Sequence, residues 1–227
     1  MRGGESMRFK AVIFDLDGTL LDTIDDLTDA MNAALAAMGY PGRTVAECKK
    51  LVGDGLETYV RRALPPGAAD DPRIAIRLKE LMRAEYKVRQ DNKTKPFEGI
   101  DEMLDSLDGL GIPLAVLSNK PHDSTLAVMK RYFPGRDFRF IFGAREGFPV
   151  KPDPSAALEI ARLLNVPPKE IAYVGDTNTD MQTANAAGMF AVGALWGFRT
   201  AEELLMNGAR ALIERPEDLL GVLSELS

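Results

Sequence analysis

Short apolar runs that end in polar residues constrain the fold of this chain most. Four of these runs cover residues 11–14, 114–117, 148–150 and 171–174. Runs of this length, closed by turn-forming residues, are typical of buried parallel strands. In open α/β sheets, ligands bind beyond the carboxyl ends of such strands. The residues that directly follow the runs are therefore the first candidates for a functional site.

Those residues carry carboxylates, a hydroxyl and an amine. They are Asp15-Leu16-Asp17-Gly18-Thr19, Ser118-Asn119-Lys120, Lys151-Pro152-Asp153-Pro154 and Gly175-Asp176-Thr177-Asn178-Thr179-Asp180. Carboxylate oxygens are ligands for hard divalent cations. A hydroxyl together with backbone N–H groups at a helix start binds anions. The four groups together predict a metal and phosphate site.

From residue 96 onward, the apolar pattern alternates between helices and strands. We expect helices over 99–110, 121–132, 154–164, 178–187 and 215–226, and strands over 112–118, 138–142, 170–175 and 189–194. This alternation predicts an α/β protein with a doubly wound, mostly parallel, Rossmann-like sheet.

The segment before residue 96 is predicted to be helical. Apolar side chains between Ile24 and Met38 recur at spacings of three and four, which predicts a helix that Asp22 caps. A second helix is expected over 44–64, interrupted at 53–55, and a third over 73–91.

This pattern predicts two domains. The core is expected to contain residues 1–21 and 96–227, and the inserted helical cap residues 22–95. An insertion of this length fits a small domain. Because it joins the core at two nearby points, it is well placed to act as a lid.

Composition narrows the class of partner. The net charge is 28 − 34 = −6, which argues against a nucleic-acid surface because phosphate contacts need clustered Lys and Arg. No apolar run approaches the roughly 18 residues of a membrane span. Cys48 is the only cysteine, so a cytoplasmic protein is expected. Residues 1–6 lack the apolar stretch of a signal peptide and are expected to form a disordered leader, with Met7 as an alternative start.

Two acidic pairs need a cation or a proton. Asp15 and Asp17 lie two residues apart at a strand end and project to the same side. Because neighbouring carboxylates repel, either one is protonated or a cation lies between them. An ordinary Asp-Gly turn is the alternative. A calcium loop of the EF-hand type is excluded, since Leu20 and Asp26 occupy its glycine and glutamate positions.

The second pair, Asp176 and Asp180, lies one helical turn apart, so the two side chains can face each other. The alternative is an N-cap aspartate followed by a carboxylate that interacts with the helix dipole. An EF-hand is excluded again, because Met181 and Ala187 occupy its glycine and glutamate positions.

The polar residues of the other two groups can bind an anion. Ser118 and Asn119 end a strand and lead into a helix, where a capped turn is the alternative. Lys151 precedes Pro152, which disfavours helical backbone and favours an extended loop. An ammonium there would neutralise a phosphate beside the carboxylates, and an ordinary surface lysine is the alternative.

The remaining distinctive residues divide into two kinds. We expect His122, the only histidine, to cap a helix or face solvent. Trp196 and Phe198, which flank Gly197 in the loop after the last strand, are expected to pack in the core or the loop. Gly53-Asp54-Gly55 forms either a loop that reaches the substrate or a plain helix kink, and the sequence leaves both open.

With these residues assembled, the chain resembles the haloacid dehalogenase-like superfamily of phosphohydrolases from Phe9 to the C-terminus. The four motifs appear in order as Asp15-Leu16-Asp17-Gly18-Thr19-Leu20, Ser118-Asn119, Lys151-Pro152-Asp153-Pro154 and Gly175-Asp176 with Asp180. The helical insertion looks like that family's type 1 cap. Ser118-Asn119-Lys120-Pro121 and Val52-Gly53-Asp54-Gly55-Leu56 are most similar to bacterial phosphoglycolate phosphatases, and pyrophosphatases and sugar-phosphate phosphatases are close in pattern.

The resemblance implies a Mg²⁺-dependent phosphatase for a small phosphate monoester, of which 2-phosphoglycolate is the first choice. Asp15 would attack phosphorus and become an aspartyl-phosphate. Asp17 would protonate the leaving oxygen and then activate water.

The resemblance also implies the ligands of the metal and the substrate. A carboxylate oxygen of Asp15, the backbone carbonyl of Asp17, and Asp176 would bind Mg²⁺, with support from Asp180 and Thr19. Ser118 and Lys151 would act in catalysis by holding the phosphoryl oxygens. The other substrate-binding candidates are Gly18, Asn119, Gly53, Asp54 and Gly55.

Other activities remain as alternatives. Asp17 argues against a dehalogenase, whose leaving halide needs no proton. A phosphonatase would need a cap lysine, for which Lys49 and Lys50 are candidates, and a phosphomutase would have to keep its aspartyl-phosphate from water. A signalling receiver domain, which also phosphorylates an aspartate beside Mg²⁺, is the alternative from another class. The expected partner is a small phosphorylated metabolite, bound by a monomer or a homodimer.

Overall fold

The computed structural model describes residues 8–224. The expected leader, the alternative start at Met7 and the end of the last expected helix (225–226) lie outside the described residues. Within the described range, none of the helices has the length and apolar character that crossing a bilayer requires.

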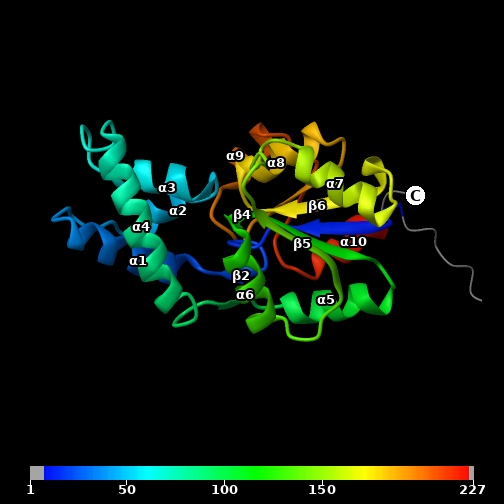
Figure 1. The fold of residues 1–227 in the computed structure, drawn as a ribbon. Coiled ribbons are helices and arrows are strands. Elements are labelled where there is room, and N and C mark those ends of the chain that lie inside the picture. Colours follow the sequence, from blue (N-terminus) through cyan, green and yellow to red (C-terminus); the bar gives the residue numbers. More distant parts are fainter. Residues whose placement is uncertain (1–7, 225–227) are drawn as a thin grey trace, which may run out of the picture.

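A six-stranded parallel sheet forms the centre of the core (Figure 1). Its strands are, in spatial order, β5 (Phe138–Ala144), β4 (Leu114–Pro121), β1 (Ala11–Phe14), β6 (Ile171–Gly175), β7 (Phe190–Ala194) and β8 (Ala211–Ile213). Strand β1 pairs with β4 on one side and with β6 on the other. The chain order therefore reverses at β1, where open α/β sheets form their ligand crevice. The predicted fold class is confirmed.

Helices cover both faces of the sheet (Figure 1). One hydrophobic cluster joins one face of β1 to α5 (Ile100–Gly109), α6 (His122–Tyr132) and α10 (Asp218–Ser224). The other joins the opposite face to α7 (Ser155–Leu164), α8 (Asn178–Ala186) and α9 (Ala201–Met206). Successive residues of β1 alternate between the two clusters. Because both faces are buried, β1 is apolar throughout.

Four further helices lie to one side of the sheet (Figure 1). They are α1 (Ile24–Ala37), α2 (Val45–Leu51), α3 (Gly55–Ala63) and α4 (Pro72–Arg89). These helices share a separate hydrophobic cluster that includes the fully buried Met31, Leu35 and Leu78. Short antiparallel strands β2 (Leu21–Asp22) and β3 (Lys95–Pro96) lie where the chain enters and leaves them. The exact boundaries of core and cap stay a prediction.

Two local predictions are wrong. Asp22 does not cap α1, because it pairs with Lys95 in the two-stranded sheet and Thr23 takes the N-cap position. Residues 148–150 do not form a buried strand. They lie in the loop after β5, where Phe148 is 47% exposed, and Pro149 has no N–H with which to join a sheet.

The break expected near 53–55 is present, with α2 ending at Leu51 and α3 starting at Gly55. Several short elements were not expected from the sequence. They are β2, β3, α9, β8 and a 3₁₀ turn at Pro168–Glu170.

Candidate active site

Asp15 and Asp17 extend from the carboxyl end of β1. The Asp15 N–H donates to the Val174 carbonyl at 2.9 Å, which holds this residue beside β6. The Asp15 carboxylate lies 2.8 Å from Lys151 Nζ, whereas Asp17 lies 2.7 Å from Lys120 Nζ. The two aspartates therefore line one cavity but pair with different lysines.

Asp176 follows β6 and is held by two donors from distant segments. Thr19 Oγ1 donates to its Oδ1 at 2.9 Å, and the Phe198 N–H donates to its Oδ2 at 2.8 Å. Gly18 packs so tightly against it that a Cβ there would lie 2.3 Å from Asp176 Oδ2. Gly18 also has φ +92°, a conformation that favours glycine. The first motif therefore positions the Asp176 carboxylate.

Lys151 joins Asp15 to Asp180. Its Nζ lies 2.8 Å from Asp15 and 2.6 Å from Asp180 Oδ1. The other Asp180 oxygen accepts from Thr177 Oγ1 at 2.6 Å and from the Thr177 N–H at 3.1 Å, which forms a capping box at the start of α8. Because the Asp180 side chain is fully buried, these contacts satisfy a carboxylate that water cannot reach.

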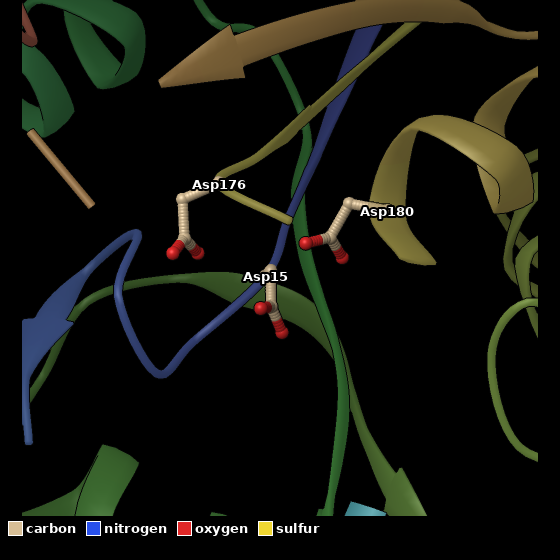
Figure 2. A group of neighbouring side chains, drawn as sticks. All are labelled: Asp15, Asp176 and Asp180. Atoms are coloured by element: carbon tan, nitrogen blue, oxygen red, sulfur yellow. The ribbon is translucent and has the colours of Figure 1, made fainter. Parts of the chain in front are cut away.

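Three of these carboxylates surround a common space (Figure 2). One oxygen from each of Asp15, Asp176 and Asp180 lies within 4.8 Å of the others. All three residues are buried, and Lys151 is the only cation that contacts the cluster among residues 8–224. A cluster of buried oxygen ligands with excess negative charge fits a hard divalent cation.

The pKa values of Asp15, Asp176 and Lys151 reflect the excess of negative charge in this cluster. Burial raises the pKa of Asp15 to about 7, with repulsion from Asp180 adding to it and attraction to Lys151 opposing it. Burial and repulsion from Asp15 hold the pKa of Asp176 well above its usual range. Burial alone would lower the pKa of Lys151, but Asp15 and Asp180 raise it well above its ordinary value. Lys151 is therefore a permanent cation.

Ser118 and Asn119 lie at the end of β4 and differ in what they contact. Ser118 is buried and lines the cavity. The Asn119 side chain accepts from the Lys151 N–H at 2.9 Å and donates to the Lys151 carbonyl at 3.0 Å. The same side-chain NH₂ group also donates to the Gly53 carbonyl at 3.1 Å. The structure therefore shows Asn119 positioning Lys151 and the cap.

A cavity of about 430 Å³ lies between cap and core. The core contributes Asp15, Asp17, Ser118 and Lys151, and the cap contributes Gly53, Gly55, Leu56 and Tyr86, among others. Of the predicted site residues, Asp15, Lys151 and Ser118 are thus brought together around one cavity.

The segment Gly53-Asp54-Gly55 packs on the core. Asp54 accepts a hydrogen bond from Thr179 and forms an ion pair with Arg62, so its carboxylate is engaged by protein groups. Nearby, Arg199 donates to the Val52 carbonyl at 2.6 Å and to the Lys49 carbonyl at the end of α2. The segment is both the break between α2 and α3 and a contact that holds the cap against the core.

Sequence reasoning assigned no role to three residues of this site. Lys120 and Tyr86 meet beside Asp17, with Lys120 Nζ 3.0 Å from Tyr86 Oη, and Arg199 holds the cap. Lys120 was part of the motif Ser118-Asn119-Lys120-Pro121, but that motif indicated no role for its side chain. Burial raises the pKa of Tyr86 to about 12, so its hydroxyl keeps its proton.

The residues expected to have no catalytic role lie as follows. His122 Nδ1 accepts from the Gly143 N–H at 3.2 Å at the start of α6. Trp196 donates to the Thr19 carbonyl at 2.9 Å, and Phe198 packs against the hydrophobic cluster of the cap.

Comparison with known proteins identifies the family. The sequence profile of the haloacid dehalogenase-like hydrolases matches residues 12–194. A phosphoglycolate phosphatase from Pseudomonas savastanoi pv. phaseolicola is 34% identical over 209 residues, which are 90% of this chain and 76% of that protein. One from Xylella fastidiosa is 33% identical over 91% of this chain and 90% of that protein.

Solved structures agree with these matches. A crystal structure of a candidate phosphoglycolate phosphatase from Lactobacillus delbrueckii subsp. bulgaricus superposes with a TM-score of 0.89 at 32% identity, covering 96% of this chain and 99% of that one. The chain therefore belongs to the haloacid dehalogenase-like hydrolases, as its four motifs predicted. The predicted enzyme class, a phosphoric monoester hydrolase, is also confirmed.

Proposed function

We propose that this protein is a Mg²⁺-dependent phosphatase that hydrolyses 2-phosphoglycolate through an aspartyl-phosphate on Asp15. The observation that carries the proposal is the single cavity into which Asp15, Asp17, Ser118 and Lys151 open, beside a buried cluster of three aspartates. The names of the relatives support the choice of substrate. A small phosphorylated metabolite is the corresponding partner, and cytoplasmic location stays a prediction.

The metal would be held by Asp15, Asp176 and the backbone carbonyl of Asp17, with Asp180 and Thr19 supporting them. Asp176 is already oriented by Thr19 and by the Phe198 N–H, an arrangement that tunes metal ligands. A bound Mg²⁺ would neutralise charge on the phosphoryl oxygens and keep the Asp15 carboxylate ionised.

The first chemical step forms the aspartyl-phosphate. A carboxylate oxygen of Asp15 attacks phosphorus in line with the ester oxygen, so that one P–O bond forms while the other breaks. Lys151 and Ser118 hold the phosphoryl oxygens. The leaving alkoxide takes its proton from Asp17, which requires that this carboxyl be protonated at that moment.

The second step returns the enzyme to its starting state. Asp17, now a carboxylate, takes a proton from a water molecule that attacks the phosphorus of the aspartyl-phosphate. The acyl phosphate bond breaks, releasing inorganic phosphate and the Asp15 carboxylate. The cap residues that line the cavity limit which alcohols fit beside this intermediate.

A substrate panel tests the proposal. The purified protein should hydrolyse p-nitrophenyl phosphate with Mg²⁺ and lose that activity in excess EDTA. Among 2-phosphoglycolate, pyrophosphate, glycerol phosphate and glucose 6-phosphate, 2-phosphoglycolate should have the highest kcat/KM. A tenfold preference for any other compound would reject 2-phosphoglycolate while leaving the phosphatase assignment intact.

The size of the cavity favours one second candidate, a sugar-phosphate phosphatase or phosphomutase. A volume of about 430 Å³ corresponds to roughly 14 water molecules at about 30 Å³ each, which is more than a two-carbon acid fills.

The receiver-domain alternative would instead show a stable phosphoprotein after treatment with acetyl phosphate, without turnover.

A further inference from the structure

Lys120 is a buried cation to which the two chemical steps assign no role. Its side chain is 4% exposed and lines the cavity. Its Nζ lies 2.8 Å and 2.7 Å from the two oxygens of Asp17 and 3.0 Å from Tyr86 Oη. A lysine is costly to bury unless its charge is paired. Asp17 pairs it through both carboxylate oxygens, although only one of these oxygens is needed for proton transfer.

We propose that Lys120 and Tyr86 bind a carboxylate on the leaving group, which makes the enzyme selective for phosphate esters of 2-hydroxy acids. The inference rests on the proposed function, because it assumes that Asp17 contacts the ester oxygen. The inference names the residues that recognise the leaving group. It also states where the substrate must carry its second negative charge.

The distances limit where that charge can be. Since Asp17 must contact the ester oxygen and Lys120 Nζ lies within 2.8 Å of Asp17, the ammonium is one contact away from the leaving group. In a phosphorylated 2-hydroxy acid, a single carbon separates the ester oxygen from the carboxylate. That carboxylate therefore reaches Lys120 when the ester oxygen reaches Asp17, whereas a more distant carboxylate does not.

The hydrogen bonds around Lys120 allow a substrate carboxylate to replace one of its contacts with Asp17. Both Asp17 oxygens accept from Lys120, but the oxygen that carries the proton for the leaving group is a weaker acceptor than a carboxylate oxygen, so its contact with Lys120 can be exchanged. An ammonium has three N–H donors, and a substrate carboxylate can take one of those now directed at Asp17. Lys120 would then bridge the protonated Asp17 and the substrate carboxylate, and its charge would balance that of the substrate.

Tyr86 supplies the second donor. Its hydroxyl accepts from Lys120 and, among the described residues, donates its own proton to no protein group. Tyr86 belongs to α4 in the cap, while Lys120 belongs to β4 in the core. The carboxylate site is therefore complete only when the cap lies against the core.

The other cations of the cavity are less suited to this role. Lys151 is already held between Asp15 and Asp180. Arg83 and Lys87, on α4, line the cavity but are exposed, so water screens them. A hydrogen bond to a charged group discriminates more strongly between substrates when it is excluded from water, as at Lys120, than when it is exposed.

The test compares two substrates that differ at one group. These are 2-phosphoglycolate and 2-hydroxyethyl phosphate, in which a CH₂OH group replaces the carboxylate. The readout is the ratio of their kcat/KM values, because a general loss of activity cancels in it. Lys120→Met should lower this ratio about 10- to 100-fold relative to wild type, as expected for losing a hydrogen bond to a charged group. Lys120→Arg should restore part of it.

Two further variants complete the design. Tyr86→Phe leaves the pair of Lys120 and Asp17 in place and should lower the ratio about tenfold, which keeps the inference testable if Lys120→Met fails to fold. Lys87→Met removes a positive charge from the exposed part of the same cavity and should leave the ratio within about twofold of wild type.

The outcomes separate the two proposals. A wild-type enzyme that prefers 2-phosphoglycolate, together with Lys120 and Tyr86 variants that keep the preference, would overturn the inference alone. A wild-type phosphatase that treats both substrates equally would overturn the proposed substrate as well as the inference. Equal losses on both substrates in Lys120→Met and no change in Tyr86→Phe would show that Lys120 only orients Asp17.

Discussion

Gly197 lies so close to Asp176 that replacing it with alanine should displace this aspartate. A Cβ built on Gly197 would lie 2.2 Å from the Asp176 Cβ and 2.5 Å from its Oδ2. Ordinary contact begins near 3.4 Å, so one of the two groups must move by 3.4 − 2.2 = 1.2 Å. The Phe198 N–H that donates to Asp176 belongs to the same loop, so either movement disturbs the carboxylate.

The size of this shift sets the expected effect. A displacement of about 1 Å at a catalytic group costs about 100-fold in rate. Disturbing the groups that orient a metal ligand costs about 10- to 100-fold in metal affinity. In Gly197→Ala we therefore expect kcat to fall about 100-fold and the Mg²⁺ concentration for half-maximal activity to rise about 10- to 100-fold. Overpacking should lower the free energy of unfolding by about 1–3 kcal/mol.

The assay is a Mg²⁺ titration of p-nitrophenyl phosphate turnover, with thermal unfolding as a measure of folding. Gly221→Ala is the matched control, because a Cβ at this position in α10 meets nothing within 4 Å. The same substitution there should stabilise the helix by about 0.5–1 kcal/mol and leave activity unchanged. If Gly197→Ala kept wild-type kcat and Mg²⁺ dependence, the geometry argued for Asp176 would be refuted.

Three further predictions concern charge and cap closure. Burial raises the pKa of Asp15 to about 7 and holds the pKa of Asp176 well above its usual range. In the metal-free protein, the contribution of Asp15 to stability is therefore fully present below about pH 4 and is lost as pH rises through 7, and Asp176 acts in the same direction. The rise in Tm on adding Mg²⁺ should therefore be larger at pH 8 than at pH 5.5, and an equal rise would contradict this. Arg199→Gln should lower kcat/KM about tenfold by loosening the cap, while Arg73→Gln, at an exposed arginine, should change it less than twofold. Similar values for both variants would argue that the Arg199 contacts do not hold the cap. Asp54→Ala should change preference among phosphate esters more than it changes p-nitrophenyl phosphate turnover, and equal losses would leave this residue a structural role only.

The sequence was most informative where strands end. Because parallel strands on either side of a switch point bring their carboxyl ends together, the order of the motifs predicted that Asp15, Ser118 and Asp176 would meet. The structure places all three at this edge. Lys151 was harder to place, since the run before it is an exposed loop. Its position depends on two backbone hydrogen bonds that it forms with the Asn119 side chain.

The contacts between cap and core could not be predicted from local pattern. Tyr86 is 34 residues from Lys120 in the chain, and Arg199 is 147 residues from Val52. These contacts depend on how the helical insertion packs against the core, which the apolar periodicity of the sequence does not encode. The same limit applies to Asp22, which helix-capping rules favoured but which pairs with Lys95 at the junction of the two parts.

The central claim is that the carboxylate of Asp15 accepts the phosphoryl group, and the activity of Asp15→Asn tests it most directly. This change keeps the size of the side chain but removes the attacking charge. With saturating Mg²⁺ and p-nitrophenyl phosphate, the variant should lose at least about 1,000-fold in kcat, while its unfolding remains a single cooperative transition. A folded Asp15→Asn protein that turns over substrate within twofold of the wild-type rate would contradict the account.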